Sequence, residues 1–318
     1  MTVLHVFAKR LFTGESQLEN QVLSIENGKI VAIQNYANQS ELPIDFQLNG
    51  HIVPGFIDLQ VNGGGGVLFN NMPTLDGIKR MISAHAQYGT TAMLPTIITD
   101  KIAVMNKAAN AVAQGIKQGV KGLLGIHFEG PHLSVSKKGA HSEKYIRAIS
   151  APEWDVFSRQ DLGQILVTLA PENVQPDDVE KLIALGVKVC LGHSNATYQQ
   201  AQSLLNVGAD GFTHLFNAMS PLQGREPGMV GCALLNDQAS CGLIVDGHHV
   251  DYHSCQLALK TKPSGTVFLV TDAMPPVGTE DLEFDFFDRK VHLSGGKLTS
   301  TTGELAGSVL DMATAVRN

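Results

Sequence analysis

The chain has 318 residues, of which 43% are hydrophobic and 17% charged, so it can bury the core of a large globular domain. Its net charge of −7 argues against binding to nucleic acid or to an anionic membrane through bulk charge. A local site for a single phosphate group remains compatible with that charge. No uncharged apolar stretch reaches the length of a membrane span.

The chain contains four cysteines, and none of them has the close spacing of a zinc knuckle or a redox dithiol. These residues are Cys190, Cys232, Cys241 and Cys255. Residues 1–20 mix lysine, arginine and glutamate without a sustained apolar run, so they do not resemble a signal peptide. Both observations favour a protein of the reducing cytoplasm.

Residues 1–51 alternate short apolar stretches with turns. Asn27 and Gly28 lie between two such stretches, and Asn-Gly at this position is a strong hairpin signal. This segment is therefore expected to form a small antiparallel β domain ahead of the main domain.

From residue 52 to residue 318 apolar runs typical of buried parallel strands alternate with helical patterns. The expected strands are 52–61, 90–98, 123–128, 165–170, 187–191, 212–216, 243–245 and 267–270. Long loops are expected after the third and the sixth of these strands. Eight strands in this rhythm fit an α/β fold, either a (β/α)₈ TIM barrel or a doubly wound sheet.

The end of the chain departs from this rhythm. Residues 282–302 alternate in the manner of a β-hairpin inserted after the last barrel strand. A final helix is expected to begin near Ser308 and to be still in progress at Asn318. A helix without a stop signal suggests that a C-terminal segment is missing from this chain.

Five of the apolar runs stop on a histidine or a carboxylate, which is costly beside a core unless a metal or a substrate satisfies the charge. Catalytic groups at the ends of several strands favour the barrel. Glu129, His193 and His214 provide the carboxylate and two imidazoles of a zinc-type site with an open position for water. Asp272 is not needed as a ligand and can act as the base that takes a proton from that water. Taken singly, each histidine is more often structural, and Asp272 could instead cap a turn.

Eight motifs, in order from about Pro54 to the end, together resemble the N-acetylglucosamine-6-phosphate deacetylase family of the amidohydrolase superfamily. The motifs are IVPGFIDLQVNG, GIHFEGPHL, KKGAH, LGHSNA, THLFNAMSPL, DGHHVD, LVTDAM and ELAGS. The resemblance implies a metal-dependent (β/α)₈ barrel with a small β-sandwich domain, whose C-terminal part we expect to be missing here. It also implies a homodimer that binds a phosphorylated amino sugar.

The same resemblance assigns roles to individual residues. The metal ligands of the family match Glu129, His193 and His214. Asp272 matches the catalytic acid–base, and His141 matches the group that polarises the acetyl carbonyl. The remaining matches concern the substrate. The residues that match its direct contacts are Ala140, Asn217 and Ala218, and those that close over it are Leu305, Ala306 and Gly307. Its phosphate is held across the dimer interface by Arg225 and His249. The guanidinium group of Arg225 can bind two phosphate oxygens at once, which fits this role, although an arginine in such a loop is more often simply solvated.

The first barrel strand departs from the wider superfamily. Many members carry a His-x-His there for a second metal, whereas this chain has Gln60 and Asn62, and amides bind zinc poorly. The resemblance therefore implies a vestigial second-metal position at these two residues, and we expect one divalent metal ion per subunit. Zn²⁺ is favoured, and Fe²⁺, Co²⁺ and Ni²⁺ suit the same ligands.

The predicted function is hydrolysis of the N-acetyl group of N-acetylglucosamine 6-phosphate to glucosamine 6-phosphate and acetate, in amino sugar catabolism. One alternative is deacetylation of a related sugar such as N-acetylgalactosamine 6-phosphate, because the orientation of one hydroxyl is not legible in the sequence. Another is a truncated, inactive chain.

Overall fold

The computed structural model of the chain describes residues 3–38, 42–287, 289–301 and 303–318. The chain divides into two compact units, residues 1–55 and 56–318. Residues 39–41 of the predicted N-terminal domain, and residues 288 and 302 of the predicted hairpin, lie outside the described residues.

The first unit contains one four-stranded sheet with the order β3-β2-β1-β4. Its strands are β1 (Leu4–Phe12), β2 (Gln17–Glu26), β3 (Lys29–Asn35) and β4 (Phe46–Ile52). The predicted hairpin is confirmed, since Glu26 pairs with Lys29 and the positive φ angles of Asn27 (51°) and Gly28 (76°) suit a two-residue turn. The expectation of a purely antiparallel unit is wrong at β4, which pairs in parallel with β1.

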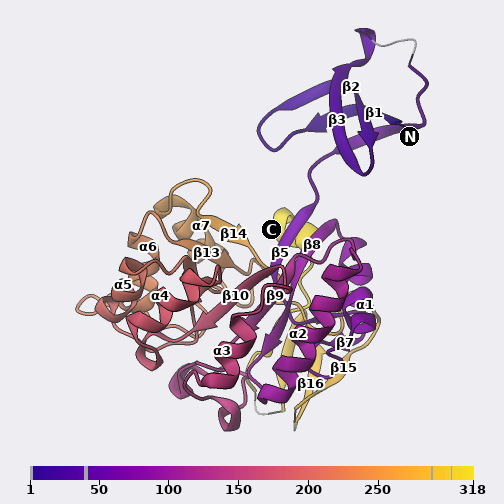
Figure 1. The fold of residues 1–318 in the computed structure, drawn as a ribbon. Coiled ribbons are helices and arrows are strands. Elements are labelled where there is room, and N and C mark those ends of the chain that lie inside the picture. The colour runs from indigo at the N-terminus through magenta and orange to yellow at the C-terminus, as the bar shows by residue number, and fades with distance from the viewer. Residues whose placement is uncertain (1–2, 39–41, 288, 302) are drawn as a thin grey trace. The chain divides into compact units, whose positions relative to one another are not determined.

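Eight parallel strands form the centre of the second unit, and neighbours in the sheet follow the order of the chain. They are β5 (Phe56–Val61), β8 (Thr90–Ile98), β9 (Gly125–Glu129), β10 (Gln164–Leu169), β11 (Lys188–Leu191), β12 (Gly211–Phe212), β13 (Ser240–Leu243) and β14 (Val267–Leu269). Val61 bridges to Ala273 just after β14, which brings the two edges of the sheet together. This nearly closed sheet confirms the predicted barrel and excludes the doubly wound alternative (Figure 1).

Eight helices accompany these strands in the described residues (Figure 1). They are α1 (Leu75–Ala86), α2 (Ile102–Lys117), α3 (Ala151–Phe157), α4 (Pro176–Ala184), α5 (Tyr198–Asn206), α6 (Gly228–Leu235), α7 (Tyr252–Thr261) and α8 (Met312–Arg317). Two of them, α3 and α6, lie where only loops were expected. Helix α6 is buried from Gly228 to Leu234, so it lacks the polar face that makes a helix periodic. Helix α3 is short, but Ser150 and Glu153 form a capping box that marks its start.

The core lies between the barrel strands and these helices, around fully buried side chains such as Phe128, Phe157 and Phe212. A second apolar cluster, which includes Met274 and Phe286, contains side chains of a small antiparallel sheet. That sheet has three strands rather than the two of the expected hairpin: β15 (Glu283–Phe286), β16 (Arg289–Ser294) and β17 (Lys297–Ser300).

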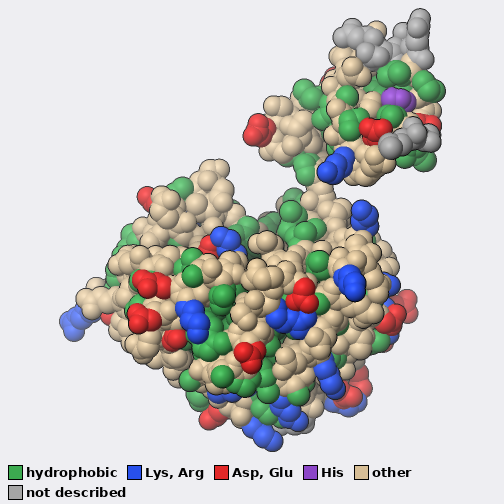
Figure 2. Space-filling model, in the orientation of Figure 1, with side chains coloured by type: hydrophobic (Ala, Val, Ile, Leu, Met, Phe, Trp, Pro, Cys, Tyr) green, Lys and Arg blue, Asp and Glu red, His purple; other side chains and the backbone are tan. Residues whose placement is uncertain are grey.

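The surface carries charges of both signs. Figure 2 shows acidic and basic side chains interspersed over the visible face of the second unit. Among the described residues, no helix combines the length and the apolar character that crossing a bilayer requires.

The approach of β12 to β13 depends on a glycine. A Cβ at Gly211 would lie 2.0 Å from the backbone oxygen of Ser240, so alanine there must push the two strands apart. We expect Gly211→Ala to lower the free energy of unfolding by roughly 1–3 kcal/mol. Gly224→Ala is the control, since a Cβ there meets nothing within 4 Å. Urea denaturation measures both variants, and equal midpoints would contradict the close strand contact.

Candidate active site

A pocket opens at the carboxyl ends of the barrel strands, where barrel enzymes place their catalytic groups. Its lining is Asn62, Ile98, Glu129, Gly139, Ala140, His141, His193, His214, Asn217, Ala218, His249, Asp272, Met274, Phe286, Leu305 and Gly307. Most of the site residues predicted from the sequence therefore meet in one place. Gln60, Arg225 and Ala306 do not line this pocket.

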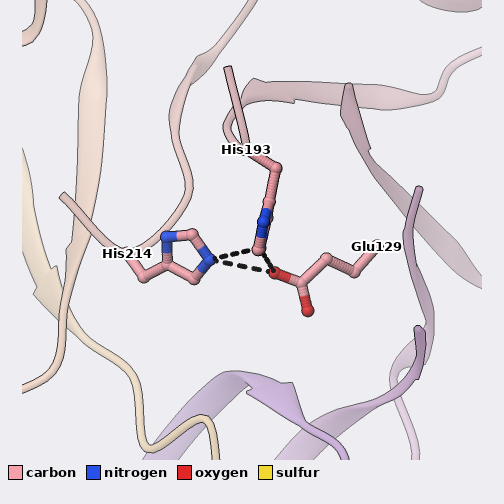
Figure 3. Close-up of side chains that lie close together, drawn as sticks. All are labelled: Glu129, His193 and His214. Atoms are coloured by element: carbon pink, nitrogen blue, oxygen red, sulfur yellow. Dashed lines mark hydrogen bonds and ion pairs between the residues drawn. The ribbon is translucent and has the colours of Figure 1, made fainter. Parts of the chain in front are cut away.

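Three of the buried side chains that line the pocket converge on one another (Figure 3). Glu129 Oε1 lies 3.2 Å from His193 Nε2 and 3.1 Å from His214 Nε2. The two imidazole nitrogens are 2.9 Å apart. Glu129 ends β9, while His193 and His214 follow β11 and β12, so the ends of three strands supply these groups, with β10 between β9 and β11.

The electrostatics of this cluster are dominated by the buried carboxylate. Burial alone would raise the pKa of Glu129, but hydrogen bonds and charge from His193 and His214 hold that pKa well below its usual value. Burial likewise disfavours the charged form of His214, yet the neighbouring Glu129 raises its pKa overall. One carboxylate oxygen and two imidazole nitrogens aimed at a common point are the donor set of a Zn²⁺ or Fe²⁺ site. The three residues therefore fit a divalent metal.

A second contact orients one of the imidazoles. His193 Nδ1 lies 2.9 Å from the backbone oxygen of Lys137, which can only accept a hydrogen bond. A proton held on Nδ1 in this way leaves Nε2, the nitrogen near Glu129, as the one that can bind a metal. Histidines that bind metals are commonly fixed in this way by a partner on the other ring nitrogen.

The backbone is strained at three of the strand ends. His193, His214 and Asp272 have φ angles of 49°, 32° and 53°, a region that residues other than glycine rarely adopt. Each such conformation costs on the order of 1–3 kcal/mol and persists only where the surroundings enforce it. Here the sharp turns direct the three side chains into the pocket, and outliers of this kind cluster at functional sites.

Asp272 is held by two amides. Asn62 Nδ2 donates to Asp272 Oδ1 at 2.6 Å, and Gln60 Nε2 donates to the same oxygen at 3.2 Å. Burial, and then the nearby Glu129 charge, raises the pKa of Asp272 to about 6. Gln60 Nε2 also donates to Glu129 Oε1 at 3.0 Å. The Gln60 amide thus lies between the two carboxylates and supplies them with a neutral donor.

His141 lies in the loop that follows β9, and its ring packs on that of His193 with the ring centres 4.4 Å apart. Burial lowers the pKa of His141 to about 3, so the ring is neutral near pH 7. Its Nδ1 is 2.8 Å from Thr99 Oγ1. No sequence motif marked Thr99, and the available signal was only its place at the end of the second barrel strand.

The residues predicted to contact substrate divide into two groups. His249 lines the pocket, and its Nδ1 is 2.7 Å from Asp246 Oδ2. Leu305 and Gly307 also line it, while Ala306 points its backbone N–H to the oxygen of Leu298. Arg225 is exposed in the loop before α6 and does not reach the pocket of its own chain.

Comparison with known proteins identifies the family of this chain. The model of the amidohydrolase family matches residues 51–277, and the chain belongs to that family. An N-acetylgalactosamine-6-phosphate deacetylase of Shewanella sp. (strain ANA-3) is 53% identical over 85% of this chain and 68% of its own length. An N-acetylglucosamine-6-phosphate deacetylase of Haemophilus influenzae is 36% identical over 92% of this chain and 78% of its own length.

A solved structure agrees with these relatives. The crystal structure of N-acetylglucosamine-6-phosphate deacetylase from Pasteurella multocida superposes with a TM-score of 0.92 at 36% identity, covering 99% of this chain and 83% of that one. The resemblance to the N-acetylglucosamine-6-phosphate deacetylase family is therefore confirmed, and the chain is a hydrolase of the deacetylase type.

The three converging side chains generate a prediction about metal content. We expect the purified protein to hold one divalent ion per chain and His214→Asn to lose most of it, because a carboxylate and a single imidazole remain. His253→Asn is the control, since the His253 side chain is 94% exposed. Elemental analysis measures the metal, and circular dichroism verifies that both variants are folded. Equal metal content in the two variants would contradict the assignment.

Proposed function

We propose that the chain hydrolyses the N-acetyl group of N-acetylglucosamine 6-phosphate to glucosamine 6-phosphate and acetate, in amino sugar catabolism. The observation that carries this proposal is the convergence of Glu129, His193 and His214 in one pocket with Asp272 and His141. We assign the first three residues to a single divalent metal, with Zn²⁺ favoured. When bound, such an ion lowers the pKa of water and polarises a carbonyl group.

Asp272 is the proposed acid–base. A carboxyl group with a pKa of about 6 is mostly ionised at pH 7, yet it holds a proton more readily than an ordinary aspartate. It takes the proton of the attacking water and later gives it to the departing amine of the sugar. Gln60 and Asn62 hold the carboxylate in position for both transfers.

His141 is the proposed donor to the acetyl oxygen. A neutral imidazole can donate one hydrogen bond to the negative charge that develops on this oxygen as water attacks. The buried position of His141 beside His193 supports this role, because donors act strongly where water is excluded. The bond between the acetyl carbon and the amine nitrogen then breaks, and acetate leaves.

We assign the rest of the pocket to the sugar phosphate. Ala140, Asn217 and Ala218 are its proposed contacts on one side, and Leu305, Ala306 and Gly307 close over it on the other. His249 was expected to reach the phosphate across the dimer interface, but it lines the pocket of its own chain, so we propose it as a phosphate contact from the same chain. Apart from Ala306, all of these residues line the pocket.

Arg225 is the proposed phosphate contact supplied by the partner subunit of a homodimer. Its exposure, and its absence from the pocket of its own chain, support this assignment. The neighbouring helices α6 and α7 also carry exposed apolar side chains suited to an interface. These are Leu235, Tyr252, Leu257 and Leu259.

We further propose a cytoplasmic location. All four cysteines are free and buried, as expected of thiols in a reducing compartment. Cys190 and Cys241, inside barrel strands, pack as small apolar side chains.

N-acetylgalactosamine 6-phosphate is a second candidate substrate, favoured by the 53% identity to the Shewanella relative. The two sugars differ in the orientation of one hydroxyl group. Acetate release measured on both epimers decides between them. Faster hydrolysis of the glucosamine derivative supports the first proposal, and hydrolysis of the galactosamine derivative alone would replace it by the second.

The role of Asp272 generates a mutational prediction. Asp272→Asn should lower kcat for acetate release by on the order of 10²–10⁴-fold, because the amide cannot take the proton from water. Metal content should stay largely intact, since Asp272 is outside the three-residue cluster. Asp237→Asn, at an exposed position, is the matched control. Near-normal turnover in Asp272→Asn would show that another group is the base.

A further inference from the structure

Thr99, at the end of strand β8, contacts His141, the proposed donor to the acetyl oxygen. Thr99 directly follows β8 and is 1% exposed. Its Oγ1 lies 2.8 Å from His141 Nδ1, and its backbone N–H points at the same nitrogen at 3.3 Å. Two groups of one residue therefore converge on a single ring atom.

The backbone contact determines which nitrogen of His141 carries the proton. A backbone N–H can only donate, so Nδ1 has to present its lone pair. The single proton of the neutral ring is then on Nε2. The opposite tautomer would set Nδ1–H against the N–H of Thr99 and leave a buried backbone donor without an acceptor, which costs about 1–3 kcal/mol.

The hydroxyl group has little freedom to move away. Gly130 packs against it so closely that a Cβ there would lie 2.2 Å from Thr99 Oγ1. Its other neighbour, the backbone oxygen of Glu129, is 3.4 Å away and thus a weaker acceptor than His141 Nδ1. The hydroxyl proton therefore also points to Nδ1 and favours the same tautomer.

We propose that Thr99 is a positioning residue, which fixes His141 as the Nε2–H tautomer and aims that proton into the pocket. Among the described residues His141 Nε2 makes no hydrogen bond, so its proton stays available to the acetyl oxygen of a bound substrate. This inference rests on the proposed function, in which His141 donates to that oxygen. With the other tautomer, Nε2 would present a lone pair and repel the developing charge.

Solid-state ¹⁵N NMR of the full chain with labelled histidine tests the tautomer without any assay of activity. The His141 signals are assigned by their loss in His141→Gln. We expect the shift of a protonated nitrogen for Nε2 and that of an unprotonated one for Nδ1. A proton on Nδ1 would overturn the inference.

Kinetics of Thr99 variants test the consequence for catalysis. Thr99→Val keeps only the longer backbone contact of 3.3 Å and loses the 2.8 Å hydroxyl contact that holds the ring in place. We therefore expect kcat to fall about tenfold while KM stays nearly constant. Thr99→Ser should restore wild-type kcat. Thr90→Val is the matched control, since Thr90 Oγ1, at the start of the same strand, is buried without a hydrogen-bond partner in the described part of the chain.

The outcomes separate the inference from the proposed function. Wild-type kcat in Thr99→Val, or the same loss in Thr90→Val, would overturn the role of Thr99 while the deacetylase activity stands. Absence of acetate release from the wild-type protein would instead overturn the proposed function, and the NMR spectrum would still report the tautomer of His141.

Discussion

The carboxylate of Glu129 is the constraint on which the site depends. It is 2% exposed, and an ionised group this deeply buried is strongly destabilising unless it is paired and hydrogen-bonded. His193, His214 and Gln60 supply those partners from three other strands. Their contacts require the ends of β5, β9, β11 and β12 to meet, so the barrel and the site are specified by the same residues.

The site also carries costs that the rest of the fold offsets. His193, His214 and Asp272 adopt left-handed backbone conformations, and Asp272 shares donors with a second carboxylate nearby. The apolar core around the barrel strands stabilises the domain enough to hold these groups in place. Burial, and then the nearby charge of Glu129, keeps the pKa of Asp272 high, which suits the proposed role of a group that both takes and returns a proton.

Much of this arrangement was predictable from the sequence, for a physical reason. Strands buried on both faces appear as apolar runs, and the residues at their ends are the ones that meet in a barrel, so the positions of Glu129, His193, His214 and Asp272 along the chain already group them. Helix α6 was missed because burial removes its periodicity. The parallel pairing of β1 with β4 joins segments far apart in the chain, and no local pattern reports it. Thr99 was missed because its hydroxyl and its backbone N–H meet His141 across 42 positions of the chain, and no local pattern reports such a contact.

The central claim is that one metal ion, held by Glu129, His193 and His214, supports deacetylation of an amino sugar phosphate. Titration of metal-free protein with Zn²⁺, followed by acetate release from N-acetylglucosamine 6-phosphate, tests it most directly. Activity should rise linearly and reach its plateau at one equivalent per chain, since Gln60 and Asn62 occupy the positions where a second ion would need imidazoles. A plateau at two equivalents, or full activity of the metal-free protein, would contradict the account.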